Sequence, residues 1–515
     1  MTHHEHLSSV KETAARAMAP LVYTINIADP AAQYADITLE VPSHGRTYID
    51  LMMARWSPGF YRVEAYAEQV RDLTAQTPAG TVLTVERLAP QRWRIDCLDG
   101  IATIRVTYRL VCNATTVTTN WIDADFALLN GPATFITRAD MLRHPHAVVL
   151  QFPAHWSHVC TGLPAQRGGL PNHYYADDFD TLVDAPIMIG TPAVSTFVVD
   201  SRRHDVIAVG DRTHWNGARA VRDLEQVVRA NCRFWKGLPY QSYVFLIVCR
   251  EGGGGLEHAT STLVTAQPSR MATAEGYGAL LHLLSHEFFH TFNVKRLRPR
   301  ELGPFDYEHP PRTVSLWVAE GLTCYYTDLL LCRAGLRTRE WLLAALSEKI
   351  TLLQAAPGRL LQTLEQSSSA VWENSFSGLN PTDTSVSYYI KGHMVGWLLD
   401  AHIRHRTQNA ASLDDVMRLA YTRYSGARGF TSTEFRDTIE EIVGASVAAW
   451  LEAAIASTAE LDYAPALAWF GLRFAPADSE CAEAAWRLQE DETASHEHRR
   501  RLHAWAADET EYGCD

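Results

Sequence analysis

The chain lacks an excess of basic residues, a long apolar run and paired cysteines. Its 515 residues include 59 acidic and 46 basic side chains, which gives a net charge of −13. This balance argues against nucleic acid as the main partner, because no cationic excess is present to displace counterions. No apolar run reaches the length of a membrane-spanning helix. Residues 1–20 have no apolar centre of the kind that a secretory signal needs, so we expect a cytoplasmic protein without a membrane span.

Cysteine use points to the same compartment. The nine cysteines are scattered, odd in number and without a C-x-x-C pair. Free thiols in a reducing cytoplasm are the simplest interpretation, and a disulfide framework is not indicated. The chain is too long for one ordinary hydrophobic core, and its 47% hydrophobic and 20% charged content is typical of a globular protein. We therefore expect two or three globular domains.

The residue patterns predict an α+β multidomain fold. After a mobile lead over residues 1–19, residues 20–195 alternate apolar and polar side chains between Gly- and Pro-bearing turns. This pattern is typical of an antiparallel β-sandwich. Residues 196–458 combine strands with a largely helical part, which predicts a second domain with an α/β lobe and a helical lobe. Residues 459–515 are expected to form a C-terminal tail. The clearest alternating segments are residues 23–27, 37–41, 92–97 and 104–110.

The most informative segment is an H-E-x-x-H sequence, His286-Glu287-Phe288-Phe289-His290, within a long apolar stretch. On a helix the two histidines share one face, so both imidazoles can bind one Zn²⁺. Glu287 is then placed to act on the attacking water rather than to bind the metal. The motif is short, and a chance match on an ordinary helix is the alternative for this segment taken alone.

A catalytic zinc site needs a third protein ligand. Glu320 is the best candidate, because it is a lone carboxylate in the apolar helical stretch 316–323. Burying an ionised carboxylate is costly unless a cation or hydrogen-bond donors meet it. The alternative interpretation is a glutamate on the helix surface. Residues 291–319, which separate His290 from Glu320, are enough for one helix to end and a second to return beside it.

Together these segments resemble the gluzincin metallopeptidases. The flanking residues resemble one branch, the glycyl aminopeptidase family, through residues 55–61, 292–299 and 320–326. The resemblance implies a thermolysin-like zincin catalytic domain that binds one Zn²⁺ per chain. It implies that His286, His290 and Glu320 hold this zinc, and that the enzyme prefers a small first residue, glycine or alanine.

Members of this family usually carry a C-terminal PDZ domain, and here the resemblance weakens. Residues 461–472 resemble the lead into that domain. Residues 477–515 are too short for it, are rich in Ala, Glu and Arg, and contain one glycine, Gly513. We therefore expect a truncated or absent PDZ domain.

A glycine-rich segment, residues 252–258, precedes the zinc helix. One interpretation is a flexible linker. The segment is also similar to the G-x-M-E-N segment of the related alanyl aminopeptidase family, whose glycines let a strand line the substrate cleft. By this match Gly254 and Gly255 contact the substrate, and Glu257 binds its free α-amine through a charge-assisted contact. His258 departs from the pattern, which has Asn there.

An aromatic segment, Tyr388-Tyr389-Ile390-Lys391-Gly392, begins an apolar stretch that is predicted to be a helix. Aromatic residues at such a place usually belong to the core. The segment also resembles the Y-x-K-G sequence of aminopeptidases, in which the tyrosine hydroxyl stabilises the transition state. By this match the hydroxyl donor is Tyr389.

These residues predict a zinc-dependent aminopeptidase that hydrolyses the first peptide bond of peptides with a free N-terminus. Glu287 serves as general base and Tyr389 as oxyanion donor. A zinc endopeptidase with the same metal site is the alternative, which equal activity on free and N-acetylated peptides would favour. A catalytically silent peptide-binding protein is a third interpretation, which zinc-dependent turnover would eliminate.

Overall fold

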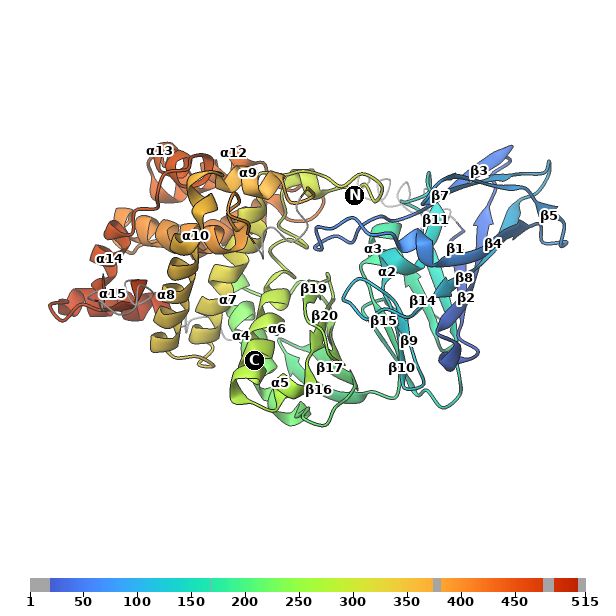
Figure 1. The fold of residues 1–515 in the computed structure, drawn as a ribbon, viewed down its shortest axis with the longest axis horizontal. Coiled ribbons are helices and arrows are strands. Elements are labelled where there is room, and N and C mark those ends of the chain that lie inside the picture. Colours follow the sequence, from blue (N-terminus) through green and yellow to red (C-terminus); the bar gives the residue numbers. More distant parts are fainter. Residues whose placement is uncertain (1–18, 167, 374–380, 476–485, 508–515) are drawn as a thin grey trace, which may run out of the picture. The chain divides into compact units, whose positions relative to one another are not determined.

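The structure is a computed structural model that describes residues 19–166, 168–373, 381–475 and 486–507 (Figure 1). The chain divides into two compact units. The first contains the described residues up to Arg55 together with Glu64–Pro192, and the second contains Trp56–Val63 and the described residues from Ala193 onward. The first unit is built of β-strands and the second of a sheet followed by helices, so the expected α+β class is confirmed.

The first unit is a β-sandwich with three sheets. Its largest sheet has the strand order β14 (His173–Ala176), β12 (His146–Gln151), β1 (Leu21–Asn26), β2 (Tyr34–Pro42), β8 (Thr103–Val111), β4 (Val70–Gln76) and β5 (Val82–Leu83). The second has β13 (His158–Thr161), β15 (Ile187–Gly190), β10 (Phe126–Leu129) and β9 (Trp121–Ile122). The third has β11 (Ile136–Arg138), β3 (Tyr48–Met53), β7 (Arg92–Asp96) and β6 (Val85–Ala89).

Alternation of apolar and polar residues explains these strands. In β8 every second residue is buried, from Ile104 to Leu110, because side chains point to opposite faces of a strand in turn. One strand pair differs from the antiparallel expectation: β1 runs parallel to β12, with Leu21 opposite His146. Most of the domain's sequence lies between these two strands, and a long connection of this kind permits parallel pairing where a tight hairpin cannot.

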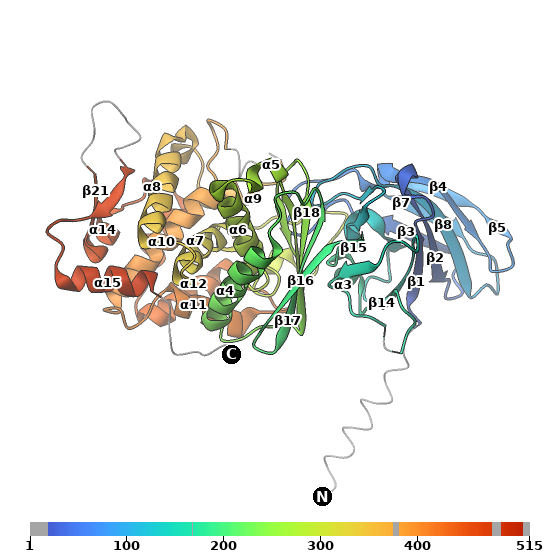
Figure 2. The ribbon, with the colours of Figure 1, turned by 90° about the horizontal axis from the view of Figure 1, so that it is seen from below.

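The second unit begins with a five-stranded sheet in the order β16-β17-β18-β20-β19. The central strands β17 and β18 pair in parallel, as do β18 and β20, whereas the short edge strand β19 runs antiparallel to β20. Helices α4 (Gly217–Trp235) and α6 (Ala274–Phe289) pack on one side of this sheet (Figure 2). The strand bounds are β16 (Ala193–Val199), β17 (Arg202–Gly210), β18 (Ser242–Cys249), β19 (Gly255–Glu257) and β20 (Ser261–Ala266).

A helical part follows the sheet. It begins with a short π-helix, η4 (Trp317–Gly321), which runs directly into α7 (Leu322–Arg333). Helix α7 and helix α10 (Tyr388–Arg406) are buried on most of their surface, as expected for apolar helices inside a bundle. The other helices are α8 (Arg339–Ala355), α9 (Leu364–Ser369), α11 (Leu413–Tyr424), α12 (Ser432–Val443), α13 (Ala448–Leu451) and α14 (Ala464–Phe470).

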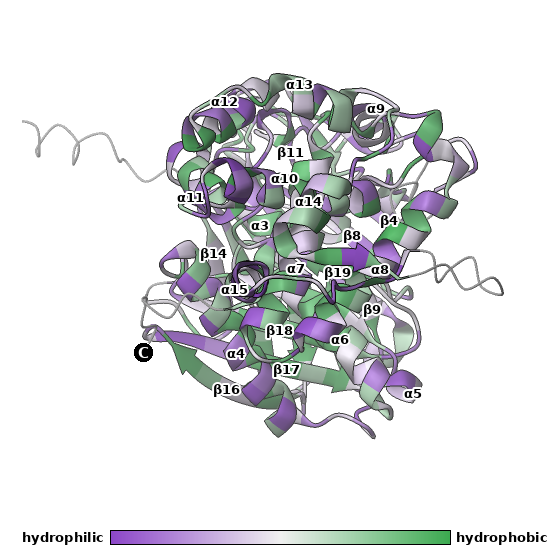
Figure 3. Cartoon of the chain, turned by 90° about the vertical axis from the view of Figure 1, so that its left-hand side faces the viewer, coloured by the Kyte–Doolittle hydropathy of each residue, from purple (hydrophilic) through white to green (hydrophobic). Residues whose placement is uncertain are grey.

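The described C-terminal residues pack on this helical part. They form a two-stranded hairpin, β21 (Leu472–Phe474) with β22 (Leu488–Glu490), and a helix, α15 (His496–Ala506). Helix α15 is largely hydrophilic (Figure 3), but it buries Trp505 completely. The Trp505 indole donates a hydrogen bond to the Tyr325 hydroxyl of α7 at 2.8 Å. No PDZ domain is present among these described residues.

Two expectations from the sequence bear on the environment of the protein. Among the helices in the described ranges, none has the length and apolarity needed to cross a bilayer. The expectation of free thiols is wrong at Cys232, which forms a disulfide bond. Within the described ranges the remaining cysteines are free: Cys97, Cys112, Cys160, Cys249, Cys324 and Cys332.

Candidate active site

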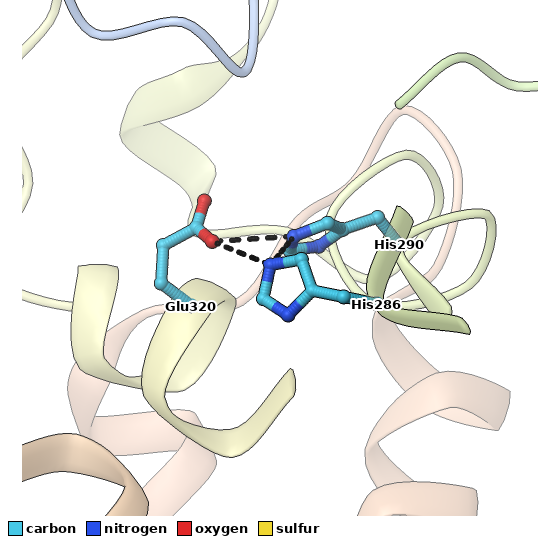
Figure 4. Close-up of side chains that lie close together, drawn as sticks. All are labelled: His286, His290 and Glu320. Atoms are coloured by element: carbon cyan, nitrogen blue, oxygen red, sulfur yellow. Dashed lines mark hydrogen bonds and ion pairs between the residues drawn. The ribbon is translucent and has the colours of Figure 1, made fainter. Parts of the chain in front are cut away.

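Three of the predicted site residues converge in the second unit. The ligand atoms of His286, His290 and Glu320 lie within 4.8 Å of one another, and their side chains point toward a common centre (Figure 4). The Nε2 atoms of the two histidines are 3.0 Å apart. The Glu320 Oε2 atom lies 3.2 Å from His290 Nε2 and 3.6 Å from His286 Nε2. All three residues are buried or nearly so, as a site that excludes bulk water requires.

Helix α6 positions the two histidines. Its N-terminus is capped by the Thr273 hydroxyl, which accepts a hydrogen bond from the Gly276 N–H. His286 lies in its last turn and His290 follows as the C-cap residue, so the four-residue spacing keeps both imidazoles on one face. The helix ends at His290 because the next residues form a tight turn.

That turn fixes the orientation of His290. The His290 Nδ1–H donates a hydrogen bond to the Asn293 carbonyl oxygen at 2.8 Å, and Nε2 is thereby left to face the site. Val294 has a φ of 154°, a value that β-branched residues rarely adopt. A strained backbone at this place presents a carbonyl to a candidate ligand histidine, and strain of this kind is common at functional sites.

Asn293 also joins the two segments that carry the candidate ligands. Its side-chain amide donates to the Val318 carbonyl at 2.8 Å and to the Thr323 hydroxyl at 3.0 Å. These residues flank Glu320 on η4 and α7. No local pattern marks Asn293, since its role depends on contacts with residues about thirty positions away.

Glu320 reaches the site from a π-helix, a conformation often found at functional sites. The following Gly321 packs against the Gly392 backbone of α10. A Cβ atom added to Gly321 would lie 2.5 Å from the Gly392 Cα, so only glycine permits this approach. The same close approach brings Tyr389 to the site, where its ring centroid is 6.5 Å from that of His286.

Glu287 lies beside the histidines and is buried, with 5% of its surface exposed. Edge strand β19 runs against it: a Cβ atom added to Gly255 would lie 2.3 Å from Glu287 Oε1. Burial raises the pKa of Glu287 well above its ordinary value, and the nearby carboxylates of Glu257 and Glu320 raise it further. The glycine of β19 therefore allows the strand to pass directly over the candidate general base.

Glu257 is the last residue of β19 and is 3% exposed. Its Oε1 atom has no hydrogen-bond partner among the described residues. Burial raises the pKa of Glu257 to about 7. Gly254, which precedes the strand, lines a pocket together with Thr265 and Leu280.

The donor set fits a zinc ion. Two imidazoles and one carboxylate are the ligands of many catalytic zinc sites, with a fourth position left open. Without a metal, the pKa of His290 is raised to about 10, because the Glu320 carboxylate outweighs the effect of burial. Glu257, Glu287 and Glu320 bring three buried carboxyl groups into one site, and a bound cation would offset the cost of burying their charged forms.

The comparisons with known proteins agree with this geometry. Residues 22–191 match the peptidase M61 N-terminal domain, and residues 279–395 match M61 glycyl aminopeptidase. The second match includes all three candidate ligands. No protein of curated function matches the chain.

Solved structures show the same fold. An aminopeptidase N family protein from Idiomarina loihiensis is similar with a TM-score of 0.81 at 24% identity, over 88% of this chain and 78% of that one. Native yeast LTA4 hydrolase is similar with a TM-score of 0.52 at 12% identity, over 86% of this chain and 68% of that one. The yeast enzyme in complex with bestatin gives a TM-score of 0.51 at 13% identity, over 86% and 68%.

Both matches are to domains of one peptidase family: the first covers the β-sandwich, and the second covers the segments that carry the buried His-His-Glu group able to hold a metal. The chain belongs to the M61 glycyl aminopeptidase family of peptidases.

Proposed function

We propose that the protein is a zinc-dependent aminopeptidase that removes the first residue of peptides with a free N-terminus, with a preference for glycine or alanine. His286, His290 and Glu320 hold the zinc, one ion per chain. When bound, zinc supplies a Lewis acid that polarises the scissile carbonyl and lowers the pKa of the attacking water.

One observation carries the choice of an aminopeptidase. Glu257 lies in the same buried site as the three candidate ligands, and its Oε1 atom is unpaired among the described residues. A buried carboxylate oxygen without a donor is costly. The α-ammonium group of a peptide would satisfy it with a charge-assisted hydrogen bond, which an internal peptide bond does not offer.

The other residues have roles that follow from their places. Glu287 takes a proton from the attacking water and passes it to the leaving nitrogen. Tyr389 donates a hydrogen bond to the scissile carbonyl oxygen as negative charge develops there. Gly254 and Gly255 let the edge strand line the cleft, and an extended peptide can add to such an edge.

A substrate panel tests this proposal. The zinc-loaded protein is assayed on glycyl, alanyl and leucyl reporters and on N-acetylated versions of each. We expect turnover of the free glycyl and alanyl compounds, slower turnover of the leucyl compound, and none of the acetylated ones. Equal rates on free and acetylated peptides would show an endopeptidase instead. Bestatin, the compound bound in the yeast structure, is expected to compete with the free substrates.

A further inference from the structure

A short segment that lies between strands β3 and β4 in sequence belongs to the catalytic unit. Residues 56–63 group with the second unit, although the residues on both sides belong to the first. The base of the loop is closed by a hydrogen bond from the Glu64 N–H to the Arg55 carbonyl at 2.6 Å.

Aromatic packing holds this segment in place. Trp56 is 1% exposed, and its indole N–H donates to the Asp306 carbonyl at 2.8 Å. Its ring meets that of Trp372 edge to face, with centroids 5.3 Å apart. Tyr61 contacts the same Trp372 ring at 5.9 Å. Such aromatic pairs fix both position and orientation, so the loop between Trp56 and Tyr61 is anchored at both ends.

The middle of the segment lies directly on Glu257. Gly59 has a φ of 92°, and a Cβ atom added to it would lie 2.2 Å from Glu257 Oε1 and 2.5 Å from Oε2. Only a glycine can occupy this position without displacing the carboxylate. The Gly59 backbone therefore forms one wall of the space in which a group bound to Glu257 must lie.

The end of the segment presents a hydroxyl to the same space. Tyr61 is 8% exposed, and its hydroxyl has no hydrogen-bond partner among the described residues. Burial raises the pKa of Tyr61 well above its ordinary value, and the Glu320 and Glu257 carboxylates raise it further. Tyr389, the proposed oxyanion donor, also interacts with Tyr61. Glu320 is an acceptor that this hydroxyl approaches, but the two make no hydrogen bond of ordinary geometry, so the hydroxyl is free to bond a bound substrate.

We propose that residues 57–61 form the wall of the binding site for the first residue of the peptide, and that Tyr61 hydrogen-bonds the substrate. The inference rests on the proposed function. In a peptide, the carbonyl carbon of the first residue is two bonds from the α-nitrogen. When the α-amine is bound to Glu257, this carbonyl therefore points toward the candidate ligands His286, His290 and Glu320. Tyr61 lies two residues after Gly59, which packs on Glu257, so its hydroxyl is placed to reach the first residue and to donate to that carbonyl oxygen.

Tyr61→Phe tests the hydroxyl. We expect kcat/KM on the free glycyl reporter to fall about 10- to 100-fold, as for the loss of one hydrogen bond to the reacting group. The affinity for a phosphinic Gly-Gly analogue, measured by calorimetry, should fall by a similar factor. Zinc content and the denaturation midpoint should not change. Tyr463→Phe is the matched control, because Tyr463 is also buried and its hydroxyl also lacks a partner in the described ranges.

Gly59→Ala tests the wall. The added Cβ atom overlaps the Glu257 carboxylate, so we expect a loss of at least about 10-fold in kcat/KM on free peptides, with zinc still bound. Gly80→Ala is the matched control. Its φ of 88° imposes a similar backbone strain, but no atom lies within 4 Å of the added Cβ.

Three results separate the possible failures. If Tyr61→Phe keeps wild-type turnover and analogue affinity, Tyr61 does not bind the substrate and the inference is wrong. If that variant loses its zinc, Tyr61 supports the metal site instead, and the inference is again wrong. If the wild-type protein binds zinc but neither cleaves a free peptide nor binds the analogue, the proposed function itself fails.

Discussion

The Nδ1–H of His290 donates to the backbone carbonyl of Asn293, while the side chain of Asn293 donates to the segment that carries Glu320. One fully buried residue thus orients a candidate zinc ligand through its main chain and holds the third candidate ligand through its side chain. The two segments that carry the candidate ligands are therefore coupled directly. Outer contacts of this kind fix the tautomer and the aim of a ligand histidine.

Asn293→Ala should weaken zinc binding. The change leaves the Val318 carbonyl and the Thr323 hydroxyl without their amide donor, so the Glu320 segment loses its tie to the α6 turn. Zinc affinity, measured by competition with a chromogenic chelator, is expected to fall about 10- to 100-fold. Asn231→Ala is the control, because Asn231 is equally buried and donates to a helix carbonyl away from the site. Equal loss of affinity in both variants would contradict the assignment.

Glu287→Gln should retain zinc and lose hydrolysis. The amide keeps the shape of the side chain but cannot accept the proton of the attacking water, and general base catalysis contributes about 10²- to 10⁴-fold. Turnover of the glycyl reporter and zinc content are measured on the same sample. Glu275→Gln, an exposed change on the same helix, should behave like the wild type. Full activity of Glu287→Gln would remove the proposed mechanism.

Glu257→Gln should act on substrates with a free amine. The neutral amide loses the ionic part of the contact with the α-ammonium group, a bond about twice as strong as a neutral one. We expect KM for the free glycyl reporter to rise about 10-fold or more. The ratio of rates on free and N-acetylated peptides is the measurement. If this ratio is the same in the variant and in the wild type, Glu257 does not recognise the amine.

Trp505→Ala should destabilise the second unit. Trp505 is completely buried and bonds the Tyr325 hydroxyl on α7, and Tyr325 in turn donates to Asp400 at 2.7 Å. Removal of a large buried aromatic side chain typically costs about 3–5 kcal/mol. Denaturant unfolding followed by tryptophan fluorescence and circular dichroism reports the loss. Trp505→Phe keeps most of the packing and should lose less. A wild-type unfolding midpoint in the alanine variant would show that α15 is dispensable.

Acid should destabilise the fold partly through His204. Burial lowers the pKa of His204 from 6.5 to about 4, so the unfolded chain takes up the proton first as the pH falls. The destabilisation of the folded state by His204 is absent well above pH 6.5, grows as the pH falls from 6.5 to about 4, and is constant below about 4. The difference between these two pKa values corresponds to a loss of stability of roughly 3 kcal/mol when both states are protonated.

The measurement is the pH dependence of the unfolding midpoint between pH 7.5 and 4. In His204→Gln this dependence should be shallower than in the wild type, whatever the change in absolute stability. The exposed His158→Gln should leave it unchanged. An identical slope in His204→Gln and the wild type would show that His204 does not contribute.

Local pattern predicted much of this protein. The four-residue spacing of His286 and His290 placed both on one helix face, and the apolar surroundings of Glu320 marked a carboxylate that needed a partner. Alternation in β8 predicted a half-buried strand, which the structure confirms. Each of these predictions depends on a repeat of a few residues, which the geometry of a helix or a strand imposes without reference to the rest of the chain.

Other relationships could not be predicted in this way. Tyr61 and Gly59 lie between strands β3 and β4, and nothing in the sequence pattern separates residues 56–63 from the first unit. The Gly321–Gly392 approach and the Trp505–Tyr325 bond join residues far apart in sequence. The buried Asp328 of α7 pairs with His282 of α6 at 2.7 Å.

By itself the sequence determined the helix and strand periods, the ligand types and their spacing along each element. These follow from steric and hydrogen-bonding rules that act over a few residues. Only the tertiary structure decided which elements meet: that Glu320 faces the two histidines, that Asn293 joins their segments, and that Gly59 lies on Glu257. These contacts depend on how distant parts of the chain pack to bury apolar surface, and side-chain packing of that kind has no period that a sequence displays.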